Sequence, residues 1–235
     1  MRTRRLALLA LLVIATLPLP ASAQSTTGST FDEIDAALRD GSPLRALRLV
    51  RRTLDDLPET VSEDEQGAAT LGRLVTLRAV AESMIDDTAA ALWSWALAQD
   101  LDPSVRDLDL RRYGSSGNLL RDTEERPLAE DGDFADDESR RINNIFRADG
   151  EVVLPDRRRG REPRYRRSAD PTPVILQVLI DRRGRPSNPR VVDAPSALRL
   201  FLAAQAVSEW RFQPARLNRD EVAIYYNIRV DFDTD

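Results

Sequence analysis

The sequence predicts an α+β protein: an N-terminal all-α, helical-repeat-like region, a linker, and a small two-layer α/β sandwich with the element order β-β-α-β-β. Two observations lead to this prediction. Between Phe31 and Leu110 apolar residues recur at helical spacing, whereas from Val222 to Phe232 they occupy every second position, as in a strand. Between these regions, at residues 111–161, the periodicity fades and charged residues dominate.

The N-terminus has the features of a secretory signal peptide. A basic start is followed by an apolar run of about twelve residues, shorter than the roughly twenty that a membrane span needs, and then by a small-x-small pattern that ends at Ala23. We therefore expect residues 1–23 to be cleaved before Gln24 and the protein to be exported to the periplasm, with no membrane span after cleavage. The alternative is a signal that is retained as an N-terminal anchor.

The composition restricts the chemistry available to the chain. It has no cysteine and no histidine, and every basic side chain is arginine. Thiolate nucleophiles, the commonest general base, the commonest metal ligands and Schiff-base lysines are therefore absent. We expect no catalytic residue, no cofactor and no metal site. The net charge of −5 becomes −8 when the signal peptide removes three arginines, which argues against nucleic acid as a partner.

A helical domain is expected at residues 31–110, after a polar spacer at residues 24–30. Four helices are predicted, because capping and helix-breaking residues separate four segments whose apolar residues have helical spacing. The expected boundary residues are Gly41, Pro43, Ser62 with Glu65 as a capping box, and Asp87.

The fourth helix resembles the second helix of a tetratricopeptide repeat in the spacing of Ala91, Trp95, Ala98 and Pro103. A second match lies upstream and requires an insertion between the two. The region therefore resembles a degenerate tetratricopeptide pair, and the alternative is an ordinary helical bundle with tryptophans in its core. Two repeats leave an open end, so we expect a partner or the rest of the chain to cover it.

Residues 111–161 are expected to form a charged linker, in which an acidic stretch precedes an arginine-rich run. RYGSSGN (112–118) predicts a turn or loop, and EVVLP (151–155) a short strand. The main interpretation is a solvated connection between two domains. The alternative is that the arginines bind an anionic surface, such as lipid headgroups or a cell-wall polymer. This arginine cluster comprises Arg157, Arg158, Arg159, Arg161, Arg164, Arg166 and Arg167.

The pattern becomes sharper after Pro171. PVILQVLID (173–181) predicts a buried strand, RRGRP a turn in which Gly184 takes a positive φ, and PRVVDAP a shorter second strand. Ser196 is the expected cap of a helix that ends near Trp210.

Three residues are expected to have a structural role where this helix meets the last strands. Trp210 and Phe212 tie the helix to the sheet, and Pro214, which has no N–H to donate, marks the end of strand pairing. Asn218 is expected to take a left-handed conformation in the turn that follows.

The stretches EPRYRRSADPTPVILQVLIDRRGRPSNPRVV, AVSEWRFQPARLNRDEV and IYYNIRVDF together resemble the C-terminal domain of the TonB family. The most specific part is the pattern Trp-x-Phe-x-Pro-Ala that begins at Trp210. The resemblance covers about residues 162–233 and implies a domain of this type at residues 162–235.

The resemblance implies that the last long strand lies at a sheet edge and accepts a short peptide from an outer-membrane receptor by strand addition. Tyr225, Asn227 and Arg229 are expected to point outward from it. The alternative is that these side chains only solvate the outer face of the sheet. The candidate partner-binding residues are Ala223, Ile224, Tyr225, Tyr226, Asn227, Ile228 and Arg229.

We therefore expect a non-enzymatic periplasmic adaptor whose partners are cell-envelope proteins or peptide segments, such as an outer-membrane receptor, or peptidoglycan. A TonB-type energy transducer for outer-membrane transport is the first alternative. It requires a retained N-terminal anchor, and the linker lacks the Pro-rich repeats of that family. A cell-wall hydrolase is the second alternative. It is disfavoured because the paired carboxylates lie in polar runs that imply no apolar pocket.

Overall fold

The computed structural model describes residues 22–123, 152–167 and 171–234. Almost all of the expected signal peptide and most of the acidic stretch of the expected linker lie outside these ranges. Within them, no helix combines the length and the hydropathy that a membrane span requires.

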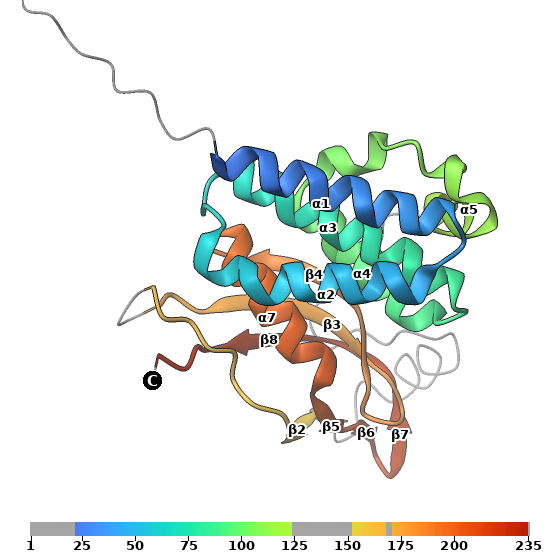
Figure 1. The fold of residues 1–235 in the computed structure, drawn as a ribbon. Coiled ribbons are helices and arrows are strands. Elements are labelled where there is room, and N and C mark those ends of the chain that lie inside the picture. Colours follow the sequence, from blue (N-terminus) through green and yellow to red (C-terminus); the bar gives the residue numbers. More distant parts are fainter. Residues whose placement is uncertain (1–21, 124–151, 168–170, 235) are drawn as a thin grey trace, which may run out of the picture.

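Helices alone form the N-terminal half, as expected (Figure 1). The four long helices are α1 (Ser22–Arg39), α2 (Pro43–Thr60), α3 (Glu65–Met84) and α4 (Thr88–Leu101). Two 3-10 turns, η1 (Pro103–Asp107) and η2 (Leu110–Tyr113), and a short helix, α5 (Gly114–Arg121), follow them.

Three of the predicted helix boundaries are confirmed. Gly41 has a φ of 69° between α1 and α2, a value that glycine adopts without strain. Pro43 is the first residue of α2, where its missing N–H costs nothing. The Asp87 carboxylate caps α4 by accepting a hydrogen bond from the Ala90 N–H at 3.2 Å.

The predicted capping box at the start of α3 is wrong. The N-cap is Asp64, whose carboxylate accepts a hydrogen bond from the Gly67 N–H at 3.0 Å. Ser62 donates its hydroxyl hydrogen to the same carboxylate at 2.5 Å. A cap at Ser62 requires the helix to begin at residue 63, but α3 begins at Glu65, so Asp64 is the residue in the cap position.

The structure differs from the expected spacer at residues 24–30, because α1 begins at Ser22 and includes them. Phe31 is the first residue of α1 found in the core. Apolar periodicity reports the packed part of a helix, so it gives no signal for a polar helical segment that precedes the first core residue.

Residues 112–118 were expected to form a turn or loop, but they belong to η2 and α5. Leu110, Tyr113, Gly117 and Leu120 are buried, and their spacing of three or four residues is helical. A Cβ at Gly117 would lie 1.8 Å from the Leu110 carbonyl oxygen. The glycine that suggested a loop is therefore needed for close packing of helical backbone.

The C-terminal half has the predicted order of two strands, a helix and further strands, so the α+β class is confirmed. Its main sheet is antiparallel with the order β4-β3-β8. The strands and the helix are β3 (Val174–Ile180), β4 (Pro186–Asp193), α7 (Ala197–Glu209), β5 (Arg211–Gln213), β6 (Ala215–Leu217), β7 (Asp220–Val222) and β8 (Ile224–Val230).

The predicted last strand is divided at Ala223 into β7 and β8. The turn before it is as expected, with Asn218 at a φ of 59°. β6 and β7 form a hairpin whose inward residues make a small core of their own with the start of β8. This second core consists of Ala215, Leu217, Val222 and Ile224.

The arginine-rich run is not a free connection. Residues 152–167, here called the arm, form β1 (Val152–Val153) and β2 (Asp156–Arg159), which pair antiparallel with β6 and β5. The strand expected from EVVLP is β1. The register places Pro155 opposite Pro214 between the two ladders, and neither proline has an N–H to donate. Pro214 was expected to mark the end of strand pairing; it lies between β5 and β6, both of which pair with the arm.

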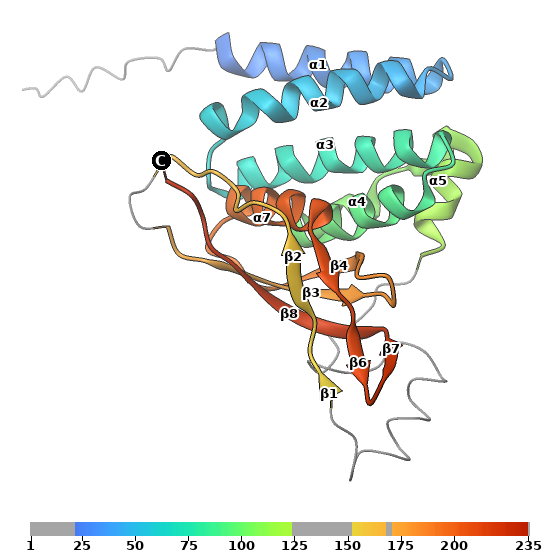
Figure 2. The ribbon, with the colours of Figure 1, turned by 90° about the horizontal axis from the view of Figure 1, so that it is seen from below.

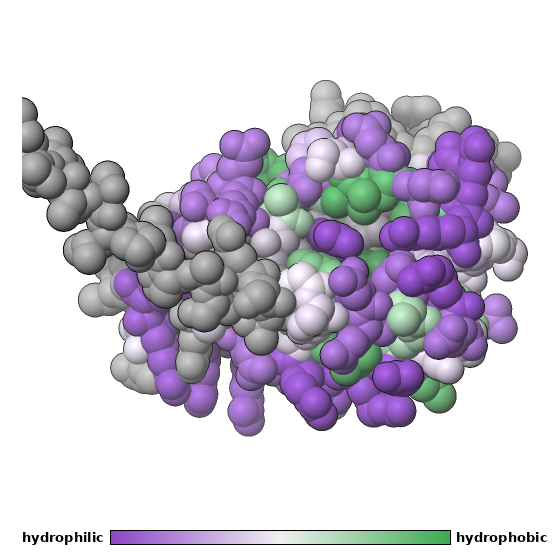
Figure 3. Space-filling model, turned by 45° about the horizontal axis from the view of Figure 1, so that its top comes forward, coloured by the Kyte–Doolittle hydropathy of each residue, from purple (hydrophilic) through white to green (hydrophobic). Residues whose placement is uncertain are grey.

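The helices and the sheet are stacked in layers (Figure 2). α1 and α2 form the outer layer, and α7 contacts α3 and α4 on one side and β3 and β4 on the other. The face that carries α1 and α2 is largely hydrophilic, with small separate apolar patches (Figure 3). Because α7 contacts α3 and α4, it covers the end of the helical region that the other helices leave open.

One hydrophobic core joins the two halves. It includes Leu74 of α3, Trp93 of α4, Phe201 of α7 and Leu176 of β3, each at most 6% exposed. Because α7 contributes to both sides of this core, the described residues pack as one unit rather than as two domains on a flexible connection.

Candidate functional site

The strand predicted to bind partners, β8, is the terminal strand of the main sheet within the described residues. It pairs with β3 without a bulge from Val174↔Val230 to Ile180↔Ile224. Ile228 and Val230 are buried in the shared core, and Ile224 is buried in the second core. A regular terminal strand is the geometry that strand addition requires.

The residues of β8 that were expected to point outward alternate with those that face the cores. Tyr225, Asn227 and Arg229 pair across with Leu179, Gln177 and Ile175, on the sheet face opposite the core. Arg229 is exposed and forms an ion pair with Asp231 at 2.9 Å. Gln177 donates a hydrogen bond to the Asn227 side-chain oxygen at 3.1 Å.

The opposite edge of the sheet is closed by the helical half. Asp100 of α4 accepts a hydrogen bond from the Val191 N–H on β4 at 2.6 Å. Its other carboxylate oxygen lies 3.2 Å from the Arg190 Nε. The Asp100 side chain is only 7% exposed, so a buried carboxylate occupies a backbone donor that an incoming strand would need.

The arm limits the length of β8 that a partner can reach. Beyond the end of β8, the Asp233 N–H donates to the Pro163 carbonyl at 2.9 Å, and the Tyr165 N–H donates to the Asp233 carbonyl at 2.8 Å. The Tyr165 ring also packs on Phe232 with 5.7 Å between ring centroids. The backbone groups of Asp233 are therefore already paired with the arm.

Trp210 anchors the arm to the end of α7. Its indole Nε1 donates a hydrogen bond to the Arg161 carbonyl at 3.0 Å, and the Arg157 guanidinium lies 4.2 Å from the ring centroid. Gly160 has a φ of 135°, and a Cβ there would lie 2.1 Å from the indole ring. Trp210 is 2% exposed, and these contacts are those of a residue that holds the arm against the end of α7.

Phe212 connects the same corner to the β3–β4 turn. The Phe212 N–H donates to the Gly184 carbonyl at 2.9 Å. Gly184 has a φ of 71°, as expected, and a Cβ there would lie 1.8 Å from the Phe212 carbonyl oxygen. Phe212 is buried in the shared core.

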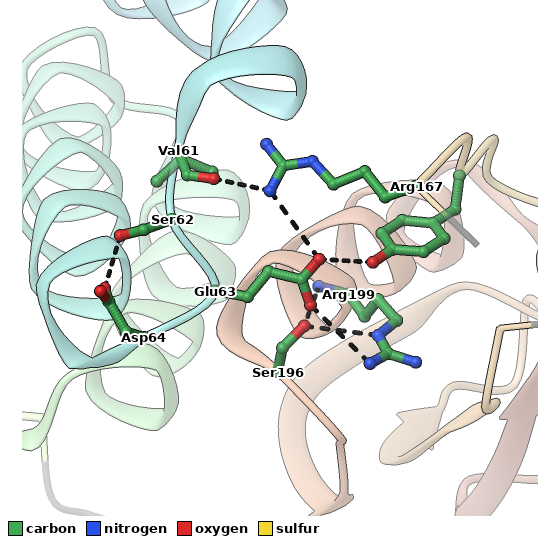
Figure 4. A network of polar contacts seen from close by, with 8 residues as sticks. Val61, Ser62, Glu63, Asp64, Arg167, Ser196 and Arg199 are labelled. Carbon is green, nitrogen blue, oxygen red and sulfur yellow. Dashed lines mark hydrogen bonds and ion pairs between the residues drawn. The ribbon is translucent and has the colours of Figure 1, made fainter.

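Glu63, which precedes α3, is the centre of a polar network that joins the helical half to the C-terminal half (Figure 4). Tyr165 of the arm donates its phenolic hydrogen to Glu63. The Arg167 and Arg199 guanidinium groups lie 3.8 and 3.7 Å from the carboxylate, and Arg167 also donates to the Val61 carbonyl at 2.7 Å. We call Glu63, Tyr165, Arg167 and Arg199 the Glu63 clamp.

The clamp shifts the titration of its members. Burial raises the pKa of Glu63, but hydrogen bonds from Tyr165 and Ser196 and the charges of Arg199 and Arg167 outweigh it, so the pKa lies below its usual value. Burial, together with the hydrogen bond to Glu63 and its negative charge, raises the pKa of Tyr165. The clamp therefore stabilises Glu63 as a charged carboxylate and Tyr165 as a neutral phenol.

The arginine cluster is divided between internal and exposed roles. Arg157 pairs with Glu162 at 2.5 Å, Arg158 lies 3.7 Å from Asp156, and Arg167 belongs to the clamp. Arg159, Arg161, Arg164 and Arg166 are exposed and form no ion pair within the described residues. Only this second group remains available to an anionic partner.

The described ranges contain no group of three or more acidic side chains placed to hold a metal ion. The acidic side chains of the sites above are instead paired with arginine, tyrosine or backbone N–H groups.

A three-stranded antiparallel sheet, one covering helix and a corner built on Trp210 define a small α+β sheet domain. The family model for the Gram-negative bacterial TonB protein C-terminal matches residues 165–234 of this chain. The resemblance identified in the sequence is thereby confirmed for this segment, which is under a third of the chain. No curated protein and no solved structure matches the chain.

Sequence reasoning singled out the β8 residues and Trp210 but missed Glu63 and Asp100. Each makes its contacts with residues about a hundred positions away in the chain. No local pattern marks such a residue, since a carboxylate beside a helix end is expected to be a cap or a solvated charge.

Proposed function

We propose that this protein is a non-enzymatic periplasmic adaptor that binds an extended segment of a cell-envelope protein by strand addition to β8. The family match supports an envelope-associated role for the C-terminal domain. The candidate contact residues are those from Ala223 to Arg229.

The observation that carries the proposal is the asymmetry of the main sheet. Asp100 occupies a backbone donor of β4, whereas β8 is a regular terminal strand at the other end of the described sheet. An added strand forms main-chain hydrogen bonds and places alternate side chains beside Tyr225, Asn227 and Arg229. The arm contacts at Asp233 then fix where the added strand stops.

The test uses the absence of cysteine from the chain. Tyr225→Cys and Arg229→Cys are made as two single variants, and each thiol is labelled with a photoactivatable cross-linker. In isolated cell envelopes, both variants are expected to form an adduct with one protein. Cross-linked positions on that protein should be four residues apart, because the two β8 positions are four apart and extended strands run in register.

The control variant is Arg183→Cys, which lies exposed in the turn between β3 and β4. It is expected to give no adduct with the same segment. Adducts scattered over a folded surface, or equal labelling from the control position, contradict strand addition.

The energy-transducer alternative is decided by the N-terminus of the protein in its own envelope. Mass spectrometry that finds Gln24 first supports the adaptor, and a chain that begins at Met1 or Arg2 supports a retained anchor. With a retained anchor, the helical half would be tethered to the inner membrane instead of being free in the periplasm.

A further inference from the structure

We propose a second docking site, on the face of α7 opposite the core, that binds an extended peptide segment with alternating acidic and apolar residues. This site is a groove with a volume of about 1050 Å³ between α2, α7 and the arm. It lies away from β8 and is independent of strand addition there. We call it the α7 groove.

The floor of the α7 groove is apolar. α7 contributes Leu202 and Ala206, both half-buried, and α2 contributes Leu54. The α7 residues that line the groove are spaced as one helical face, at positions 202, 205, 206 and 209, while the other face packs into the shared core. Leu54 is buried in the shared core, and Leu202 and Ala206 pack against it while remaining half-exposed. The helix therefore presents a second, partly apolar surface that its own fold covers only in part.

The wall formed by the arm is basic. Arg159, Arg161 and Arg164 line the groove, all are exposed, and none forms an ion pair within the described residues. The hydrogen bond from Trp210 to the Arg161 carbonyl holds this part of the arm in place. Glu162 also lines the groove, but Arg157 pairs with it at 2.5 Å.

The opposite rim carries Asp55 of α2 and Glu209 of α7. The three arginines without an ion pair among the described residues lie on the arm and the two carboxylates on the helices, where Asp55 is 4.0 Å from Arg51, and Arg211 of β5 also lines the groove. In an extended peptide, successive side chains point to opposite sides. A peptide with acidic residues at alternate positions can pair with the arm while its apolar side chains lie on the floor, away from the acidic rim.

These features favour a peptide over an anionic lipid surface. The arginines form one wall of a concave site, and the two rim carboxylates would repel a planar anionic membrane. The headgroups of a membrane are polar, so its apolar chains could reach Leu202 and Ala206 only if the groove were inserted into the bilayer. An extended peptide can place an apolar side chain on these two residues directly.

The test measures binding of a fluorescent six-residue peptide of alternating glutamate and leucine to the mature full-length protein, by anisotropy. We expect saturable binding that weakens as salt is added. A peptide of alternating glutamine and leucine is expected to bind at least tenfold more weakly. Vesicles that contain an anionic lipid, assayed by co-sedimentation, are expected not to bind through the same arginines.

The variant Arg159→Glu/Arg161→Glu/Arg164→Glu is expected to weaken peptide binding at least tenfold. Its matched control is Arg45→Glu/Arg48→Glu/Arg52→Glu, which makes the same charge change at exposed positions of α2 outside the groove, and is expected to bind within about twofold of the unmodified protein. Ala206→Phe fills the floor and is expected to weaken binding without any change of charge. Circular dichroism melts verify that each variant is folded.

Several results would overturn the proposal. These are equal binding of the glutamine peptide, unchanged binding by the arm variant, and no binding up to millimolar peptide. Vesicle binding that is lost in the arm variant, without peptide binding, would assign the arginines to a lipid surface instead.

Discussion

The Trp210 indole donates a hydrogen bond to the Arg161 carbonyl at 3.0 Å, and this bond joins the most specific residue of the family pattern to a residue outside the matched segment 165–234. The part of the arm from Val152 to Arg164 lies before that segment, yet it contains the strands that pair with β5 and β6. The folded unit is therefore larger than the sequence family. A domain cut at residue 165 would lose the partner of Trp210.

Trp210→Ala is expected to lower the free energy of unfolding by about 3 kcal/mol, the typical cost of truncating a large buried aromatic side chain. Trp210→Phe keeps much of the packing but loses the Nε1 hydrogen bond, and it should cost less. Urea denaturation measures both. A Trp210→Ala protein with unchanged stability and a lost partner would instead identify this corner as a contact surface.

Gly160→Ala is expected to destabilise the protein by about 1–3 kcal/mol, because the φ of 135° is strained for alanine and the new Cβ would collide with the indole ring. Gly28→Ala is the control. Gly28 lies in α1 with no atom within 4 Å of an added Cβ, so its stability should stay the same or rise slightly. Thermal melts that show equal loss in both variants would contradict the contact.

Glu63→Gln tests the Glu63 clamp through pH. The folded-state pKa of Glu63 is lowered, so its contribution is present above the unfolded value near 4.5 and is lost as pH falls through the folded pKa. The variant should be less stable at pH 7 by no more than about 1 kcal/mol, because the site is partly solvated. The difference between the two proteins should vanish at low pH. A constant difference at every pH would exclude an ionic role for this residue.

Tyr113→Phe tests a contribution to stability that is lost at high pH, whereas that of Glu63 is lost at low pH. Burial, and then the hydrogen bond to Asp35, raise the pKa of Tyr113 to about 12. Its contribution, on the order of 2 kcal/mol, is therefore present below pH 10 and is lost as pH rises toward 12. Absorbance titration of the four tyrosines should lose its last-titrating group in the variant. If the late group persists, it belongs to another tyrosine.

Asp100→Ala is expected to cost about 3 kcal/mol, because it leaves Arg190 without its carboxylate and removes the acceptor of the Val191 N–H. Asp100→Asn keeps an acceptor for the N–H and should be milder. The unprotected β4 edge should also promote association, which light scattering would detect. A monomeric Asp100→Ala protein of normal stability would mean that the edge is closed by other groups.

The elements of this fold were predictable where a local pattern sets them. The alternation in β8, the helix start at Pro43, the cap at Asp87 and the turn at Asn218 follow from backbone preferences of single residues and short spacings. Glu65 was misassigned to a capping box because two neighbouring residues, Ser62 and Asp64, both suit a cap. Only tertiary contacts decide between them.

The relation between the halves was not predictable in the same way. The charged composition of residues 152–161 indicated a solvated linker, because a strand with four exposed residues such as β2 has no apolar signature. Its pairing with β5 depends on main-chain groups, which every sequence has. The same reason hid Asp100 and Glu63, whose roles come from what lies across the interface.

The arm also sets the order in which the chain can complete its structure. Arg161 and Trp210 are 49 residues apart, and Glu63 and Tyr165 are 102 apart, so these contacts form slowly compared with the helix pairs of the first half. A chain that emerges N-terminus first can pair α1 to α4 early, but the arm has no strand to join until β5 and β6 have arrived. The basic arm is thus secured only after β5 and β6 are present, and the C-terminal residues determine when the protein becomes resistant to proteolysis.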